Sequence, residues 1–158
     1  MPAADRVLAR LDDVAALYHR LILIVGPAGS GKTSALRDVS KRTGTTLLNL
    51  NLRLSGELLE MTERQRELKL PGVLEDSVAG NGSLVILDNI EILFDRGLKQ
   101  DPLRLLQKLS RNRTVVASWT GTVSGGSLTY AAPEHPEYRR YPCTDLVVVT
   151  LEGGSANA

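Results

Sequence analysis

The sequence has a single cysteine, almost no net charge and no long hydrophobic run, and each shortage excludes something. Cys143 is the only cysteine among 158 residues, so no internal disulfide can form, which fits a reducing cytoplasm. The net charge of +1 at pH 7 gives no overall attraction to nucleic acid or to a membrane surface. The longest apolar runs are of strand length and no signal peptide opens the chain. We therefore expect a cytoplasmic protein that does not contact a membrane.

Internal repeats are absent too, and the length of 158 residues fits one domain of ordinary size. Hydrophobic residues make up 42% of the chain, which is enough for a buried core. We predict a single domain over residues 1–152, which includes an N-terminal helix, followed by a disordered tail over residues 153–158.

The stretch from Gly26 to Thr33 has the pattern G-x-x-x-x-G-K-T, which is the Walker A motif, or phosphate-binding loop, of P-loop NTPases. Residues 21–25 before it form an apolar run that predicts a buried strand, and residues 34–39 after it predict a helix. The alternative is a glycine-rich turn that carries a lysine by chance, but motif, strand and helix agree. The predicted nucleotide-binding residues are Gly26, Pro27, Ala28, Gly29, Ser30, Gly31, Lys32, Thr33 and Ser34.

Each residue type in this loop has a physical task. The glycines let the backbone bend so that successive N–H groups point at the phosphates, and the positive end of the following helix adds to that field. Lys32 supplies a charge for the β- and γ-phosphates, and the hydroxyl of Thr33 coordinates Mg²⁺. No Asn-Lys-x-Asp guanine motif occurs, so we expect ATP, rather than GTP, as the nucleotide.

Residues 84–88, Leu-Val-Ile-Leu-Asp, predict a buried parallel strand that ends in Asp88. Ligands of open α/β sheets bind at the carboxyl ends of the strands. An aspartate there holds Mg²⁺, as the Walker B residue does. The alternative reading of Asp88 is a residue that caps a helix.

The next residue is Asn89, at a position where many ATPases of the AAA+ type have a glutamate that polarises the attacking water. An amide cannot accept the proton and can only orient the water. Glu91 is the nearest carboxylate, and it would face the same side as Asn89 if the strand continued. Glu91 is therefore either the catalytic base or a structural carboxylate, and the sequence leaves both open.

Residues 114–121 predict another buried strand, and this strand ends in polar residues. A polar side chain at such a place reads the γ-phosphate and positions water, a role called sensor 1. Thr120 is the first choice for this role and Ser118 the second. Trp119, the only tryptophan, is expected to pack in the core.

The other elements follow from periodicity and turn signals. An amphipathic helix is expected over residues 5–18, and Gly44 should end the helix that follows the phosphate loop. Leucines alternate with polar residues over 45–55, which predicts an edge strand. A charged helix is expected over residues 57–70, ended by Pro71-Gly72.

A helix should begin at Asp101-Pro102, and its Arg104, Lys108 and Arg111 form a basic stripe. Such a stripe is usually a solvated face, and contact with DNA or with a partner is the alternative. Residues 121–142 read as a long irregular loop, followed by the last strand over 146–151.

Arg139 and Arg140 come just before the last strand, where AAA+ proteins keep an arginine finger that acts on a neighbouring subunit. The alternative is a pair of surface arginines. Together these patterns predict an α/β fold. It is an AAA+/ASCE-like P-loop core with a five-stranded parallel sheet flanked by helices and without a C-terminal lid domain.

Four stretches of the chain resemble BrxF, the small P-loop component of type III BREX phage-defence systems. These stretches are GPAGSGKT, LVILDNIEILFD, DPLRLLQKLSRNRTVVASWTG and LTYAAPEHPEYRRY. The resemblance implies an ATPase that acts beside a methyltransferase, a phosphatase-like protein and large ATPase or helicase partners.

Two departures from the full AAA+ pattern, Asn89 and a chain that ends after the fifth strand, argue against fast hydrolysis by one subunit. We therefore expect an ATPase with slow intrinsic turnover that assembles with itself. The alternative is a nucleotide-dependent switch that recruits DNA-acting partners. A small-molecule kinase is a third reading, but the sequence shows no arginine-rich lid between the motifs.

Overall fold

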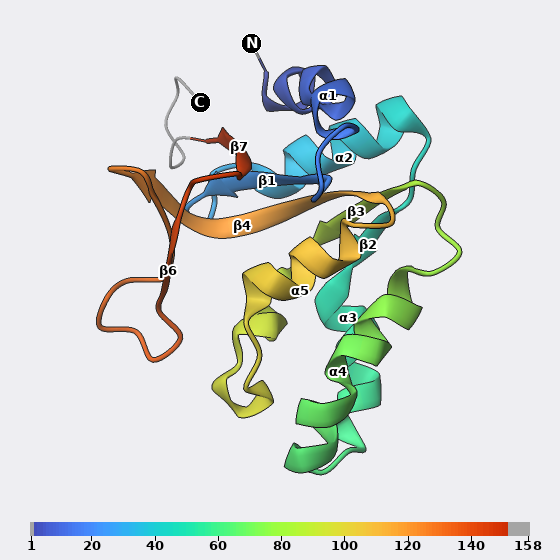
Figure 1. Cartoon of the computed structure of the whole chain (residues 1–158), viewed down its shortest axis with the longest axis vertical. Helices are drawn as coiled ribbons and strands as arrows, with labels where there is room; N and C mark the ends of the chain where they lie inside the picture. The colour runs from blue at the N-terminus through green and yellow to red at the C-terminus, as the bar shows by residue number, and fades with distance from the viewer. Residues whose placement is uncertain (1, 152–158) are drawn as a thin grey trace.

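The computed structural model describes residues 2–151, and its centre is a parallel sheet of five strands (Figure 1). The strands lie in the order β2-β3-β4-β1-β7, so the first strand of the chain is flanked by the fourth and the last. This confirms the predicted five-stranded parallel fold. The strands are β1 (Leu21–Gly26), β2 (Leu47–Asn49), β3 (Leu84–Asp88), β4 (Thr114–Ser124) and β7 (Val147–Thr150).

Helices cover both faces of the sheet, which is why the central strand β1 is buried at every position. In β1, Leu23 and Val25 pack in one core cluster while Ile22 and Ile24 pack in the other. Figure 1 shows α1 and α2 on one side of the sheet and α3, α4 and α5 on the other. The helices are α1 (Ala3–Val14), α2 (Lys32–Thr43), α3 (Leu50–Leu59), α4 (Glu63–Val78) and α5 (Pro102–Leu109).

Two predicted helix boundaries are confirmed by their caps. Gly44 follows α2 with a left-handed backbone at φ 69°, and Asp101 caps α5 by accepting a hydrogen bond from the backbone N–H of Arg104. The predicted first helix was too long. It ends at Val14, and Tyr18 lies beyond it with 67% of its surface exposed.

The strand predicted over residues 45–55 is wrong beyond its first residues. Only Leu47–Asn49 is extended, at the predicted sheet edge, and the chain then enters α3. The side chain of Asn49 accepts from the N–H of Leu52 and so starts the helix. Leucines two apart fit a strand, but those four apart also fit one helix face: Leu50 and Leu54 are buried while Leu52 is 72% exposed.

The helix predicted over residues 57–70 is wrong at both ends. Thr62 begins a new helix, α4, through a capping box with Gln65, and α4 runs on through Pro71 to Val78. Pro71 has no N–H for the carbonyl of Glu67, four residues earlier. The amide of Gln100 donates to that carbonyl at 2.8 Å, so a side chain distant in sequence satisfies the group that the proline leaves free.

The stretch 121–142, predicted to be irregular, contains a three-stranded antiparallel extension of the sheet. Strand β4 runs past the end of β1 to Ser124 and pairs with β5 (Ser127–Tyr130), which pairs with β6 (Arg139–Pro142). Gly125 and Gly126 make the first turn with positive φ angles, as a two-residue hairpin turn requires. A side chain at Gly121 would collide with the carbonyl oxygen of Thr129, so only glycine fits there.

Aromatic side chains join this extension to the core. Trp119 is fully buried, which confirms its predicted packing role, and its indole N–H donates to the carbonyl of Thr129 at 3.0 Å. The rings of Phe94 and Tyr130 stack with centroids 3.6 Å apart, and Trp119 meets Phe94 edge-on at 5.1 Å. The extension is therefore fixed to the body of the domain.

Over residues 2–151, no helix combines the length and the apolar character that a membrane crossing requires. The predicted tail over 153–158 lies outside the described residues.

Candidate active site

The phosphate loop connects β1 to α2 with the backbone geometry that its glycines allow. Gly29 and Gly31 have φ angles of 77° and 97°, in the left-handed region. At Gly26 the reason for glycine is space, because an added Cβ would collide with the hydroxyl of Ser30. The loop therefore leads directly into the first turn of α2, whose N–H groups and positive dipole end suit an anion.

Lys32, the first residue of α2, is buried and points back along the loop. Its ammonium donates to the backbone carbonyls of Gly26 at 2.9 Å and Pro27 at 2.7 Å. Burial lowers the pKa of Lys32, while the nearby charges of Glu91 and Asp88 act in the opposite direction. A positive charge, two carboxylates and the helix terminus therefore share one space.

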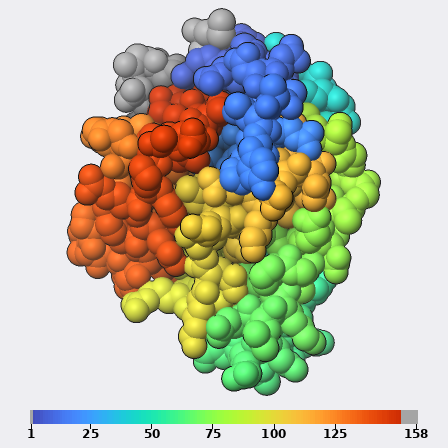
Figure 2. Space-filling model, in the orientation of Figure 1, coloured from blue at the N-terminus to red at the C-terminus, as the bar shows by residue number. Residues whose placement is uncertain are grey.

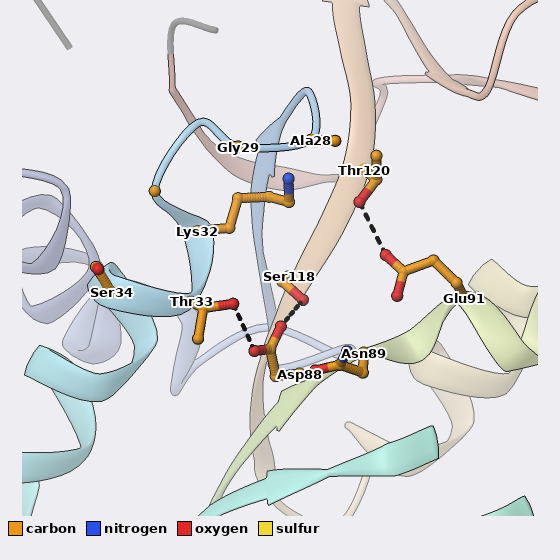
Figure 3. A pocket seen from close by; sticks show the side chains of 11 residues that line it. Ala28, Gly29, Lys32, Thr33, Ser34, Asp88, Asn89, Glu91, Ser118 and Thr120 are labelled. Atoms are coloured by element: carbon orange, nitrogen blue, oxygen red, sulfur yellow. Dashed lines mark hydrogen bonds between the residues drawn. The ribbon is translucent and has the colours of Figure 1, made fainter. Parts of the chain in front are cut away.

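Asp88 ends β3 and accepts two short hydrogen bonds. The hydroxyl of Thr33 donates to one carboxylate oxygen and the hydroxyl of Ser118 to the other, each at 2.7 Å (Figure 3). These are hard oxygen ligands of the kind that Mg²⁺ prefers. Mg²⁺ is commonly held by one or two carboxylates together with water and phosphate oxygens, so one carboxylate and one hydroxyl from the protein would suffice. The residues present thus fit Mg²⁺.

The sequence places Glu91 on the same side as Asn89 only if the strand continues. Strand β3 ends before Glu91, so this condition for a role of Glu91 as the base is not met. Asn89 takes a left-handed backbone at φ 56°, and η1 (Ile90–Phe94), a 3-10 helix, follows. This turn nevertheless delivers Glu91 to the site. Its carboxylate accepts from the hydroxyl of Thr120 at 2.8 Å, on the side of the cleft opposite Thr33 (Figure 3).

The cleft enclosed by these elements has a volume of about 440 Å³. It is built at the carboxyl ends of three neighbouring strands, with Gly26 of β1 beside Thr120 of β4 and Asp88 at the end of β3. Both sensor candidates face it, but their partners differ: Ser118 bonds to Asp88 and Thr120 to Glu91. The lining residues are Ala28, Gly29, Gly31, Lys32, Thr33, Ser34, Asp88, Asn89, Glu91, Ser118 and Thr120.

A second hollow of about 310 Å³ adjoins the loop between α1 and α2, and the sequence analysis did not identify it. It shares Gly31 and Ser34 with the first cleft. Two buried polar atoms beside it, Nε of Arg6 and Oγ of Ser30, have no hydrogen-bond partner within the described part of the chain. Arg6 precedes a core residue on an amphipathic helix, and that pattern alone carries no sign of a ligand.

The two candidate finger arginines lie outside the cleft of their own chain. Both belong to β6, whose place in the antiparallel extension the sequence did not reveal. Arg139 is half-buried and donates to the backbone carbonyl of Gln100 at 2.7 Å. Arg140 is exposed and donates to the hydroxyl of Ser127 at 3.1 Å.

Close to Glu91, the pKa of Tyr130 is raised to about 12, mainly by burial and also by the charge of Glu91. Tyr130 therefore stays neutral at ordinary pH, and its ring packs on Phe94 at the far end of η1. The 3-10 turn that carries Glu91 is thus held against the antiparallel extension.

Comparison with known proteins agrees with this geometry. The model of the ATPase family associated with various cellular activities (AAA) matches residues 22–117, which include the phosphate loop, Asp88 and the start of β4. Among solved structures, C. elegans PCH-2 superposes with a TM-score of 0.50 and 18% identity over 94% of this chain and 42% of that one. This likeness shows the fold alone.

Two further solved structures share less. AMPPCP-bound DnaA from Aquifex aeolicus has a TM-score of 0.39 and 15% identity over 72% of this chain and 36% of its own. A DNA replication initiation factor has a TM-score of 0.47 and 14% identity over 94% of this chain and 44% of its own. The chain thus spans less than half the length of each of these three proteins.

Proposed function

The chain belongs to the AAA family of ATPases, and from this we propose that it binds Mg·ATP and hydrolyses it slowly as a self-assembling oligomer. The observation that carries the proposal is the meeting of Lys32, Asp88 and Glu91 around one cleft at the carboxyl ends of the strands. A positive charge for phosphate, a carboxylate for the metal and a carboxylate for water are the groups that such hydrolysis needs.

Binding would use groups that already face the cleft. The N–H groups of the loop and of the first turn of α2 would bind the phosphates, and Lys32 would exchange its two carbonyl partners for phosphate oxygens. Thr33 and Asp88 would hold Mg²⁺, which neutralises charge on the phosphates. The hollow between α1 and α2 lies next to the loop and would take the base. The sequence has no guanine motif, so we propose ATP.

Glu91 is the proposed general base, because Asn89 has no lone pair basic enough to accept a proton from water. The hydroxyl of Thr120 fixes the orientation of the Glu91 carboxylate and leaves its other oxygen free to face water. Glu91 sits on a 3-10 turn two residues beyond the usual position, so we expect turnover to be slow in an isolated subunit.

An arginine from a second copy would complete the site. Neither Arg139 nor Arg140 lines the cleft of its own chain, so either must act on a neighbour's ATP if it acts on ATP at all. An arginine beside the γ-phosphate can raise the rate by about 10³–10⁵. Arg140 is exposed whereas Arg139 is half-buried, so Arg140 is the freer of the two to reach across an interface.

We propose BREX phage defence as the setting, and the support for this is the resemblance of the four stretches to BrxF. The proposed partners are those of that system: a large ATPase, a methyltransferase, a phosphatase-like protein and a helicase. The competing function is a nucleotide-dependent switch that recruits DNA-acting partners and hydrolyses little. The amide at Asn89 and the restraint of Glu91 by Thr120 favour that alternative.

Mixing inactive variants tests the shared site. Lys32→Ala should weaken binding of labelled ATP by roughly 10- to 150-fold, because a charge-assisted phosphate contact is lost. Arg140→Ala or Arg139→Ala, whichever is the finger, should abolish turnover and leave ATP affinity nearly unchanged. Equal ATP affinity of Lys32→Ala and the unmodified protein would refute the binding site.

A mixture of the finger variant with Lys32→Ala should recover part of the activity, since each supplies what the other lacks. Arg53→Ala, an exposed arginine on α3, is the matched control and should turn over normally. If the mixture stays inactive while size measurements show that both variants oligomerise, the shared site is wrong and the switch function replaces it.

A further inference from the structure

A third hollow, of about 370 Å³, lies at the end of the sheet opposite the phosphate cleft. It is formed where residues 17–19 lead into the start of β1 and where residues 145–147 lead into the start of β7. No step of the proposed ATP chemistry uses it. Its walls are Leu17, Tyr18, His19, Asp145, Leu146 and Val147.

An exposed aromatic ring and a guanidinium form the rim of this hollow. Tyr18 is 67% exposed, and the guanidinium of Arg111 lies over its ring at 4.8 Å from the centroid. Arg20 donates to the backbone carbonyl of Arg111 at 3.0 Å, which ties the segment before β1 to the end of α5. In Figure 2 the blue segment before β1 lies between the orange end of α5 and the red segment that leads into β7.

Cations continue from this ring along α5. Arg104 and Lys108 are four residues apart and Arg111 follows three later, so they share the exposed side of the helix and its end. Arg104 approaches Asp101 at 3.8 Å, but the Arg104 side chain is 81% exposed, so this ion pair is weak and leaves Arg104 available to another anion. The hollow itself contains one carboxylate, the exposed Asp145.

We propose that this surface binds single-stranded nucleic acid, with one base in the hollow beside Tyr18 and the phosphates along Arg111, Lys108 and Arg104. An aromatic face next to a row of cations is the combination that binds single strands with little sequence preference. The apolar walls suit the faces of a base, and a base paired inside a duplex could not enter.

Asp145 distinguishes this ligand from an acidic peptide. A carboxylate inside the hollow repels the side chains of such a peptide, but it accepts hydrogen bonds from the exocyclic amino group of a base, as aspartate does with cytosine. The surface should therefore favour bases with an amino group. Oligo(dC) should bind more tightly than oligo(dT), which lacks that group.

Fluorescence anisotropy with labelled oligo(dC) of about 12 nucleotides, a length that single-strand-binding folds cover, tests the site on the full chain. Tyr18→Ala should weaken binding by about tenfold through lost stacking. Arg111→Glu should also weaken it, and should lower the slope of log affinity against log salt by about 0.7, the value for one phosphate contact on a single strand. Arg37→Glu changes an exposed arginine of α2 and should retain the affinity.

Asp145→Gly tests the base preference without straining the chain, since Asp145 has a φ of 66° that glycine adopts freely. This variant should bind oligo(dC) and oligo(dT) equally. Loss of affinity that is the same in Tyr18→Ala and Arg37→Glu, or no loss in either, would overturn the site. Equal competition by poly-glutamate would show an unspecific cationic surface. Lys32→Ala should still bind the oligonucleotide. The nucleic-acid proposal and the ATP proposal can therefore fail independently of each other.

Discussion

The hydrogen bond between Thr120 and Glu91, 2.8 Å long, offers a sharp test of how the cleft works. If Glu91 is the base and Thr120 acts only by positioning it, the two residues must act as a unit. Removal of the base should slow turnover by about 10²–10⁴-fold in Glu91→Gln. Removal of the hydroxyl in Thr120→Val should cost about 1.5–3 kcal/mol, the range for a hydrogen bond to a charged group, which is roughly 10- to 150-fold in rate.

The double variant separates positioning from an independent role. Phosphate release is measured for the unmodified protein, for each single variant and for Glu91→Gln with Thr120→Val. The double variant should be no slower than Glu91→Gln alone, because a hydroxyl that orients an absent carboxylate has nothing left to do.

Two further variants control this cycle. Thr120→Ser keeps the hydroxyl and should keep most of the rate. Thr122→Val removes a hydroxyl from the same strand, where it bonds to the Thr129 hydroxyl at 2.8 Å outside the cleft, and should leave the rate unchanged. If the rate losses of the two single variants multiply in the double variant, Thr120 does not act by positioning Glu91. Faster turnover in Thr120→Val would mean that Thr120 restrains Glu91, as the switch function requires.

Two predictions concern stability and are read from thermal or denaturant unfolding. Gly121→Ala would place a Cβ against the carbonyl oxygen of Thr129, so we expect a loss of about 1–3 kcal/mol; unchanged stability would mean that the β4–β5 pairing is not as described. Gln100→Ala should cost about 1–3 kcal/mol because the carbonyl of Glu67 loses its partner, and the loss should shrink in a Pro71→Ala background, where the helix supplies its own N–H; equal losses in both backgrounds would contradict this account.

Much of the site could be predicted because its residues act through neighbours in the chain. The G-x-x-x-x-G-K-T pattern specifies its own turn, since the backbone freedom of Gly29 and Gly31 and the N-terminus of α2 are local properties. The apolar run before Asp88 likewise specifies a strand buried on both faces, and the order of strands in this class places its end beside the loop.

The predictions of the fold were wrong where a local sequence pattern is compatible with two structures. Alternating leucines fit a strand and one face of a helix, and the cap at Asn49 decided for the helix. Pro71 normally ends a helix, but the amide of Gln100, 29 residues later in the sequence, lets α4 continue. The strands after Gly121 were not predicted, because their pairing requires that residue 121 has no side chain where the carbonyl of Thr129 comes close. A sequence pattern does not show that a glycine is there to allow such an approach.

The sequence by itself therefore determined the phosphate loop and the buried strand that ends in Asp88, because these depend on consecutive residues and short-range backbone preference. Only the tertiary structure decided the place of Glu91, since its position depends on a 3-10 turn packed against β4 and on the hydroxyl of Thr120, 29 residues away in the chain. It also decided that Arg139 and Arg140 lie outside their own cleft. Side-chain direction at such places follows from packing between distant segments, which no local pattern encodes.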